Sequence, residues 1–310
     1  MFKRILVPLD TSKLAEIALP YAEELAIKLG SEVILVHVRT PTDAPANPDH
    51  RVYMSKITAE VEQRIKKSPA LPPGERVKVA SAIIGAPNII NHPGEEILKY
   101  AENENINLIV MATHGRTGIR RWALGSTANN IARVSKHPVL LVRANTDVPR
   151  SVHMEKILVP LDGSKPGEAV IPYIEYLVSR LKSGISLLNV VEPPYHIYPY
   201  TDGLDYYGGA GIVRVPFTEE EMKPLKETAV KYIKSVSDKL TAGGISARYE
   251  VRVGSPGEEI TSVESETHPD LVVMSTHGHS GFGRWDHGSV TDKVLHQGKT
   301  PLLLIRPRKP

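Results

Sequence analysis

The sequence has no cysteine in its 310 residues. A chain without thiols can form no disulfide, thiolate zinc site or iron–sulfur cluster, and it suits a reducing compartment, so we expect a cytoplasmic location. No apolar run approaches the roughly 20 residues that span a bilayer. The opening run in MFKRILVPLD stops at Asp10, which is too short for a signal peptide. We expect neither membrane insertion nor export.

The sequence also has little net charge, because 38 Lys and Arg residues stand against 35 Asp and Glu residues. A formal charge of +3 gives no reason to expect a nucleic acid or a membrane as partner, and the basic stretch at 306–309 is typical of a solvated end. The hydrophobic fraction of 41% is ordinary for a globular protein. At about 100 to 200 residues per domain, the length predicts two domains.

An internal repeat supports that division. Three segments recur in the same order: KRILVPLDTSK… at 3–38 and EKILVPLDGSK… at 155–190, NLIVMATHGRTGIRRWALGST at 107–127 and DLVVMSTHGHSGFGRWDHGSV at 270–290, and HPVLLVR at 137–143 and TPLLLIR at 300–306. We therefore predict two copies of one domain of about 150 residues. Domain 1 is expected at 1–146 and domain 2 at 147–310.

Each copy alternates strand and helix patterns. In the first copy, apolar runs predict strands at 5–9, 33–38, 77–84, 107–112 and 138–143, with helices at 14–29, 51–67, 94–104 and 126–136. Gly30 is expected to end the first helix, and Thr218 to Glu221 forms a capping box in the second copy. Alternating elements imply right-handed crossovers. The sequence thus predicts an α/β protein with two repeated, doubly wound, five-stranded parallel-sheet domains.

Two loops of each copy are expected at the carboxyl edge of the sheet, where such folds bind ligands. Pro8, Leu9 and Asp10 follow the first strand, and the segment THGRTG follows the fourth strand and leads to Gly125 and Ser126 at a helix start. Glycines let the backbone approach a ligand, and a helix N-terminus offers unpaired N–H groups to a phosphate. This combination predicts an anion site.

These motifs resemble the universal stress protein family in its tandem form, over nearly the whole chain. The shared motifs are ILVPLD-x-S, VILVHV, VMATHGRTG, the later GST and PVLLV. The resemblance implies the adenine nucleotide alpha hydrolase-like, Rossmann-like unit, and stress response or signalling as the role. Members that bind ATP carry G-x2-G-x9-G-[S/T]; here the second and third glycines are present in both copies, but Ala112 and Ser275 replace the first glycine.

The resemblance also implies site residues. In each copy the aspartate would lie against adenosine, the valine and the methionine would border the base, and the glycine loop with the following helix start would hold the phosphates. For domain 1 these and their loop neighbours are Pro8, Leu9, Asp10, Val38, Met111, His114, Gly115, Arg116, Gly125, Ser126 and Thr127. For domain 2 they are Pro160, Leu161, Asp162, Val190, Met274, His277, Gly278, Gly288, Ser289 and Val290. The implied ligand is ATP or another adenine nucleotide, with Mg as a candidate companion.

Some of these residues have a purely structural alternative. The valines and methionines end buried strands and would be apolar in any case, and Asp10 suits a helix cap. The two copies also differ, because Arg116 and Ala123 of domain 1 correspond to His279 and Asp286 of domain 2. A carboxylate repels phosphates. We expect domain 2 to bind more weakly or to prefer a less charged ligand.

Other motifs bear on whether the chain binds a metal or catalyses a reaction. His277, His279 and His287 lack an accompanying acidic or thiolate ligand at a convincing spacing, so we expect a solvated loop and no metal site. No Walker-type lysine loop or serine elbow is present. A nucleotide-binding module is therefore favoured over a slow ATPase or other adenine-nucleotide-processing enzyme. The substitutions at Ala112 and Ser275 keep a nucleotide-free interaction protein as a third possibility.

The sequence also predicts how the two domains assemble. The apolar strands at 139–142 and 302–305 would be open edges, so we expect the two domains to pair through them as a pseudo-dimer. The insert at 193–216, rich in Tyr, Gly and Pro, is interpreted as a surface loop, with a lid or partner contact as the alternative. Further association into a homo-oligomer and an unknown protein partner are expected.

Overall fold

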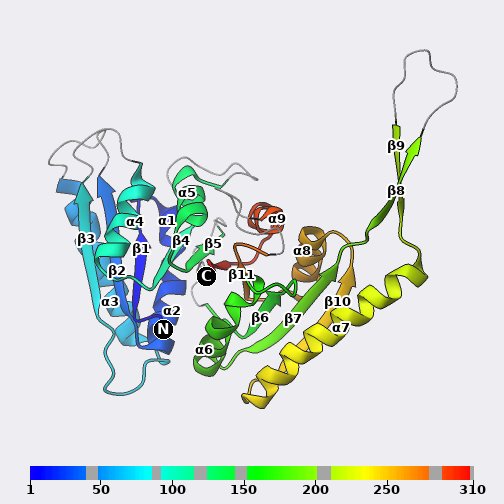
Figure 1. Ribbon diagram of the computed structural model, residues 1–310. Helices are drawn as coiled ribbons and strands as arrows, with labels where there is room; N and C mark the ends of the chain where they lie inside the picture. The colour runs from blue at the N-terminus through cyan, green and yellow to red at the C-terminus, as the bar shows by residue number, and fades with distance from the viewer. Residues whose placement is uncertain are drawn as a thin grey trace, which may run out of the picture.

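The computed structural model describes residues 1–39, 48–85, 92–114, 124–143, 152–200, 211–278 and 288–307. Within these residues, ten strands form one continuous sheet that runs through both copies of the repeat, in the order β10-β7-β6-β11-β12-β5-β4-β1-β2-β3 (Figure 1). The boundary predicted between residues 146 and 147 lies outside the described residues. No helix of the described chain combines the length and apolarity needed to cross a bilayer.

Domain 1 has the expected alternation of strands and helices, with all its strand pairs parallel. Its elements are β1 (Arg4–Pro8), α1 (Lys13–Glu16), α2 (Leu19–Leu29), β2 (Glu32–Arg39), α3 (Pro48–Lys67), β3 (Val79–Gly85), α4 (Pro93–Asn103), β4 (Leu108–Ala112), α5 (Ser126–Val134) and β5 (Val139–Val142). The single helix predicted at 14–29 is wrong. It divides into α1 and α2 because Pro20, in the first turn of α2, cannot donate a backbone hydrogen bond. Gly30 ends α2 in the left-handed conformation, as predicted.

Domain 2 repeats this order with one insertion. Its elements are β6 (Lys156–Pro160), η1 (Gly167–Val170), α6 (Ile171–Leu181), β7 (Gly184–Val191), β8 (Tyr195–Tyr200), β9 (Gly211–Pro216), α7 (Glu219–Ala242), β10 (Ala247–Val253), α8 (Pro256–Thr267), β11 (Leu271–Ser275), α9 (Ser289–Gln297) and β12 (Leu302–Ile305). The capping box of Thr218 and Glu221 at the start of α7 is confirmed. The predicted pair of five-stranded parallel domains is thus present.

The two domains join through their last strands. β5 and β12 pair antiparallel, with Leu141 opposite Leu302 and Val139 opposite Leu304. All four side chains are buried. One apolar cluster under α2, α3, α6 and α7, and another under α4, α5, α8 and α9, each include residues of both domains. The predicted pairing through the final strands is confirmed, and it removes two apolar edges from solvent.

Two arginines cross this junction in a symmetric way. Arg143, just after β5, donates to the main-chain oxygens of Val294 (2.9 Å) and Leu295 in the last turn of α9. Arg306, just after β12, donates to the main-chain oxygen of Arg133 (2.9 Å) in the last turn of α5. The last carbonyls of a helix have no intrahelical donor, and a cation suits that end of the helix dipole. Each domain therefore caps the last helix of the other.

The insert of domain 2 is not the surface loop that we expected. Residues 195–200 and 211–216 form an antiparallel hairpin, β8–β9, which stands clear of both domains in Figure 1. The sequence YHIYPY and its partner GIVRVP are rich in aromatic and β-branched residues, which favour strands. In the sequence, this aromatic and β-branched composition, rather than a long apolar run, is what indicates the hairpin.

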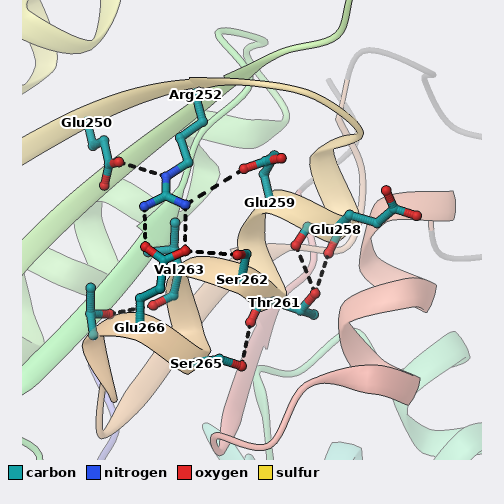
Figure 2. A network of polar contacts seen from close by, with 11 residues as sticks. Glu250, Arg252, Glu258, Glu259, Thr261, Ser262, Val263, Ser265 and Glu266 are labelled. Carbon is teal, nitrogen blue, oxygen red and sulfur yellow. Dashed lines mark hydrogen bonds and ion pairs between the residues drawn. The ribbon is translucent and has the colours of Figure 1, made fainter.

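An ion-pair network fixes α8 to the edge strand β10 (Figure 2). Arg252 of β10 makes two hydrogen bonds, of 2.8 and 2.5 Å, to the carboxylate of Glu266 and a third to Glu250 at 2.7 Å. Ser262 donates to the same Glu266 carboxylate at 2.8 Å. The hydrogen bonds from Arg252, with that from Ser262, lower the pKa of Glu266 to about 2. The network ties the outer edge of the sheet to the helix layer.

Candidate functional site

A cavity of about 280 Å³ opens at the carboxyl edge of the domain 1 sheet. The strand order reverses between β1 and β4, since β2 lies beside β1 and β5 lies beside β4. Loops leaving β1 and β4 separate at such a point and leave room for a ligand. Residues of β1, β2 and β4 line one side of the cavity and the start of α5 lines the other. The cavity therefore lies where the fold class predicts a site.

The described lining residues include most of those expected from the sequence. They are Pro8, Leu9, Asp10, Ala15, Val36, His37, Val38, Pro93, Ile97, Met111, Ala112, Thr113, His114, Gly125, Ser126, Thr127 and Ala128. Gly115 and Arg116 lie outside the described residues. Val38 and Met111 are buried at the strand ends, which is consistent with both a base-binding and a core role.

Asp10 organises the loop after β1. Its Oδ1 accepts from the backbone N–H of Ser12 (3.0 Å) and from the Ser12 hydroxyl (2.6 Å). The Ser12 Oγ in turn accepts from the N–H of Ala15 as the N-cap of α1. Between them Thr11 has a φ of 70°, where domain 2 has Gly163 at 84°. A β-branched residue at positive φ is strained, and such strain concentrates at functional sites. The helix-cap alternative is partly correct: Ser12 is the cap, and Asp10 holds it.

A buried histidine under this loop, His37, is not among the site residues predicted from the sequence. His37 Nδ1 lies 2.8 Å from the carbonyl oxygen of Leu9, and its Nε2 lies 3.2 Å from Nδ1 of His50. In domain 2 the corresponding Asn189 donates from Nδ2 to the carbonyl of Leu161 at 2.7 Å. Both copies thus hold the carbonyl that precedes the loop aspartate. In the sequence, this contact is indicated by a polar residue, His37 or Asn189, at the same position of an otherwise apolar strand in each copy.

The N-terminus of α5 also borders the cavity. Gly125 is the N-cap, and its N–H donates to the carbonyl of Thr113 at 2.9 Å, so the loop after β4 and the helix start are held together. A Cβ on Gly125 would lie 3.1 Å from that carbonyl oxygen. Ser126 and Thr127 follow in the first turn and line the cavity. The first N–H groups of a helix have no intrahelical acceptor and attract anions.

His114 and His277 occupy matching places after β4 and β11. Nδ1 of each lies near the preceding threonine Oγ1, at 3.1 Å from Thr113 and 2.8 Å from Thr276. Burial lowers the pKa of both histidines, helped by the charge of Arg143 beside His114 and of Arg306 beside His277. Both imidazoles are therefore neutral at pH 7. Among the described residues, nothing accepts from or donates to the buried Nε2 of His114.

The matching loops of domain 2 meet closely. Asp162 Oδ1 accepts from Ser164, and the other carboxylate oxygen lies so near Gly278 that a Cβ there would approach it to 2.2 Å. Gly288 caps α9 and donates to the carbonyl of Thr276 at 3.0 Å, as Gly125 does in domain 1. The remaining expected residues occupy the equivalent strand ends and helix start: Pro160, Leu161, Val190, Met274, His277, Ser289 and Val290. His279, Asp286 and His287 lie outside the described residues.

Fold and site together define a tandem α/β protein with a cavity at the carboxyl edge of its sheet. The sequence profile of the Universal stress protein family matches residues 1–143 and again 153–306. The chain therefore belongs to the universal stress protein family and carries two such domains.

Both single-domain and two-domain relatives support membership in this family. Universal stress protein MJ0577 of Methanocaldococcus jannaschii is 31% identical over 155 residues, covering 46% of this chain and 96% of its own. Universal stress protein Slr1230 of Synechocystis sp. is 22% identical over 98% of this chain and 100% of its own. The crystal structure of a universal stress protein from Archaeoglobus fulgidus superposes over 99% of both chains, with a TM-score of 0.66 and 19% identity. That structure supports the fold across both domains.

Proposed function

We propose that domain 1 binds ATP or a related adenine nucleotide, and that the chain acts in stress response or signalling as a binding module. The observation that carries this proposal is the cavity, which joins apolar strand ends to a helix N-terminus. Its volume of about 280 Å³ is near the lower end of small-ligand sites. An adenine nucleotide has matching parts, with an apolar aromatic base at one end and anionic phosphates at the other.

The described residues suit each part of such a ligand. Val38 and Met111 offer an apolar wall for the base, and Asp10 lies at the turn beside it. Ser126 and Thr127 offer hydroxyls and first-turn N–H groups to phosphates. Mg²⁺ in nucleotide sites is bound largely through phosphate oxygens and water, so it is a candidate companion of the bound nucleotide.

The same residues favour binding over fast chemistry. Among the described residues, the titratable side chains that line the cavity are Asp10, His37 and His114; Asp10 and His37 hold the loop after β1, and His114 contacts Thr113 through Nδ1. A general base must reach the proton that it removes. Because Asp10 and His37 are engaged in holding the loop and only the buried Nε2 of His114 is left without a partner among these groups, slow ATP hydrolysis is the second candidate function and rapid turnover is not expected.

Domain 2 is proposed to be the weaker site. Its loop aspartate, Asp162, lies directly against Gly278, so the two loops that flank the expected site are in contact. The charge contrasts seen in the sequence point the same way, with Asp286 and His279 where domain 1 has Ala123 and Arg116. A less charged adenine ligand is the alternative occupant.

One experiment separates the two nucleotide-binding classes from the nucleotide-free interaction module. The purified protein is heat-denatured, and released nucleotides are identified by mass spectrometry. The refolded or nucleotide-stripped protein is then titrated calorimetrically with ATP. Released adenine nucleotide, or saturable ATP binding that is lost in Gly125→Glu, supports the proposal. If the stripped protein binds no adenine nucleotide, the nucleotide-free interaction module is the correct class.

A further inference from the structure

The hairpin β8–β9 exposes apolar side chains on both of its faces. Ile197 is opposite Arg214, and Tyr198 is opposite Val213, so adjacent pairs point to alternate faces. The exposed large apolar residues of the hairpin are Tyr195, Ile197, Tyr198, Ile212, Val213 and Val215, each between 42% and 67% exposed. Exposed apolar patches larger than a few hundred Å² mark interaction sites.

Within the described chain, only the base of the hairpin is anchored. His196 stacks on Phe217 with ring centroids 4.6 Å apart and bonds Glu221 of α7 at 2.8 Å. Beyond this point the strands project away from both domains (Figure 1). An isolated two-stranded hairpin is marginally stable in water and needs a further strand or a helix against it.

A second exposed apolar strip adjoins the hairpin, on α7 and β10. It consists of Val230 on α7 with Tyr249 and Val253 on β10. β10 is an end strand of the described sheet, so one of its edges is open. Elsewhere in the described chain, the exposed large apolar residues are Met1, Val52, Val134 and Leu225, which do not gather on one surface element. The exposed apolar surface is thus concentrated in two neighbouring parts of domain 2.

We propose that the β8–β9 hairpin is a dimerisation arm that docks on the α7–β10 face of a second copy of this chain. The chain carries both halves of the contact, and a two-fold axis would make each half meet its complement twice. Arg214 on the arm has the charge opposite to that of Glu220 in the first turn of α7, where Glu219 is already paired with Lys226 at 3.0 Å.

The chain has enough residues in these elements for a specific interface, which needs about 20 to 30 residues a side. Each copy can contribute residues of the six-residue strands β8 and β9 and, on its other surface, of the 24-residue α7 and the seven-residue β10. This contact is separate from the β5–β12 junction, which lies within one chain. It is also independent of the proposed nucleotide site in domain 1.

The first test is the mass of the full chain by sedimentation equilibrium or by light scattering after gel filtration. The wild type should have twice the single-chain mass of 34.1 kDa. The double variant Ile197→Lys/Ile212→Lys should dissociate at least about 100-fold more readily. Val52→Lys, an equally exposed change on α3, is the matched control and should stay dimeric. Circular dichroism should be unchanged in both variants because all three positions are exposed.

The second test identifies the docking face. Val230→Lys/Tyr249→Lys alters the α7–β10 strip and should also yield a monomer. When this variant is mixed with Ile197→Lys/Ile212→Lys, one intact arm meets one intact face, so differently tagged chains should co-purify as a heterodimer. A wild-type chain that stays monomeric up to roughly 100 μM, or a dimer that survives the arm substitutions, overturns the proposal. Absence of the mixed heterodimer overturns the docking face.

Discussion

Nη2 of Arg143 lies 2.9 Å from the main-chain oxygen of Val294, in the other domain. The half-buried guanidinium also bonds the carbonyls of Leu295 and Thr300. Burial lowers the pKa of Arg143 to about 10, and the nearby carboxylate of Glu264 opposes that shift, so the group is charged at neutral pH. In return, Arg306 caps the last turn of α5. The helices α5 and α9, whose N-termini lie at the predicted phosphate sites, therefore each end at an arginine of the other domain.

Loss of the Arg143 contact should destabilise the whole chain. Arg143→Met keeps much of the side-chain volume but leaves buried carbonyls without a donor, and we expect the free energy of unfolding to fall by about 2 to 4 kcal/mol. Urea denaturation measures this change. Arg306→Met should cost less because that guanidinium bonds two main-chain oxygens, those of Arg133 and Ser135, where Arg143 bonds three. The exposed Arg51→Met is the control, and an equal effect at positions 51 and 143 would contradict the capping role.

The junction strand offers a sharper test. Leu141 is fully buried opposite Leu302. Leu141→Asp removes a core side chain, which alone costs about 2 to 5 kcal/mol, and adds a buried carboxylate without a partner. We therefore expect a large drop in thermal stability by calorimetry. Val52→Asp, at a 66% exposed position of α3, should change it little. A wild-type melting curve for Leu141→Asp would show that the strand pairing contributes little to stability.

The two proposed nucleotide sites should differ in affinity. Gly125→Glu places a carboxylate at the start of α5, where phosphates are proposed to bind, and should weaken ATP binding at least about 10-fold. Gly288→Glu makes the same change at α9 and should affect only a weaker site. Calorimetric titration of both variants and the wild type compares them directly. The ranking is wrong if the tighter site persists in Gly125→Glu and disappears in Gly288→Glu.

Turnover of ATP should be slow. The hydrogen bonds of Asp10 and His37 give these two residues loop support as their evident role, and Nε2 of His114 is the one position left to act as a base among the described titratable groups that line the cavity. We expect ADP formation well below about one per second, the lower end of ordinary enzyme rates. Chromatographic assay of ADP from protein cleared of contaminating ATPases measures it, with Gly125→Glu as the background control. A steady rate at or above that value, abolished by Gly125→Glu, would make the chain an enzyme.

The Arg252–Glu266 pair should contribute to stability in a pH-dependent way. The pKa of Glu266 lies near 2 in the folded chain, below its ordinary value of 4.5, so the folded state favours the ionised carboxylate. This stabilisation is fully present above about pH 4.5 and is lost as the pH falls through 2. The melting temperature of Glu266→Gln should therefore lie below that of the wild type at pH 7, by a margin that shrinks on acidification. Glu62→Gln, an exposed change on α3, should show no such trend.

Much of the domain fold followed from local patterns. Apolar runs placed the buried strands, the repeat of ILVPLD and THG motifs revealed two copies, and Thr218 with Glu221 marked the start of α7. The gap between α1 and α2 was missed because a continuous apolar stripe concealed the effect of Pro20. The hairpin was missed because its strands are short and lie outside the repeat.

By itself, the sequence determined most of the repeated elements, the division into two copies and the pairing of two apolar edges, because these depend on local hydrophobic pattern and on the cost of exposing strand edges. Only the tertiary structure showed the crossing of Arg143 and Arg306 and the support of the Leu9 carbonyl by His37. An arginine after a strand or a histidine within one has no partner until distant segments are packed together. The direction of the hairpin was likewise decided by its anchor on Phe217 and Glu221 at the start of α7.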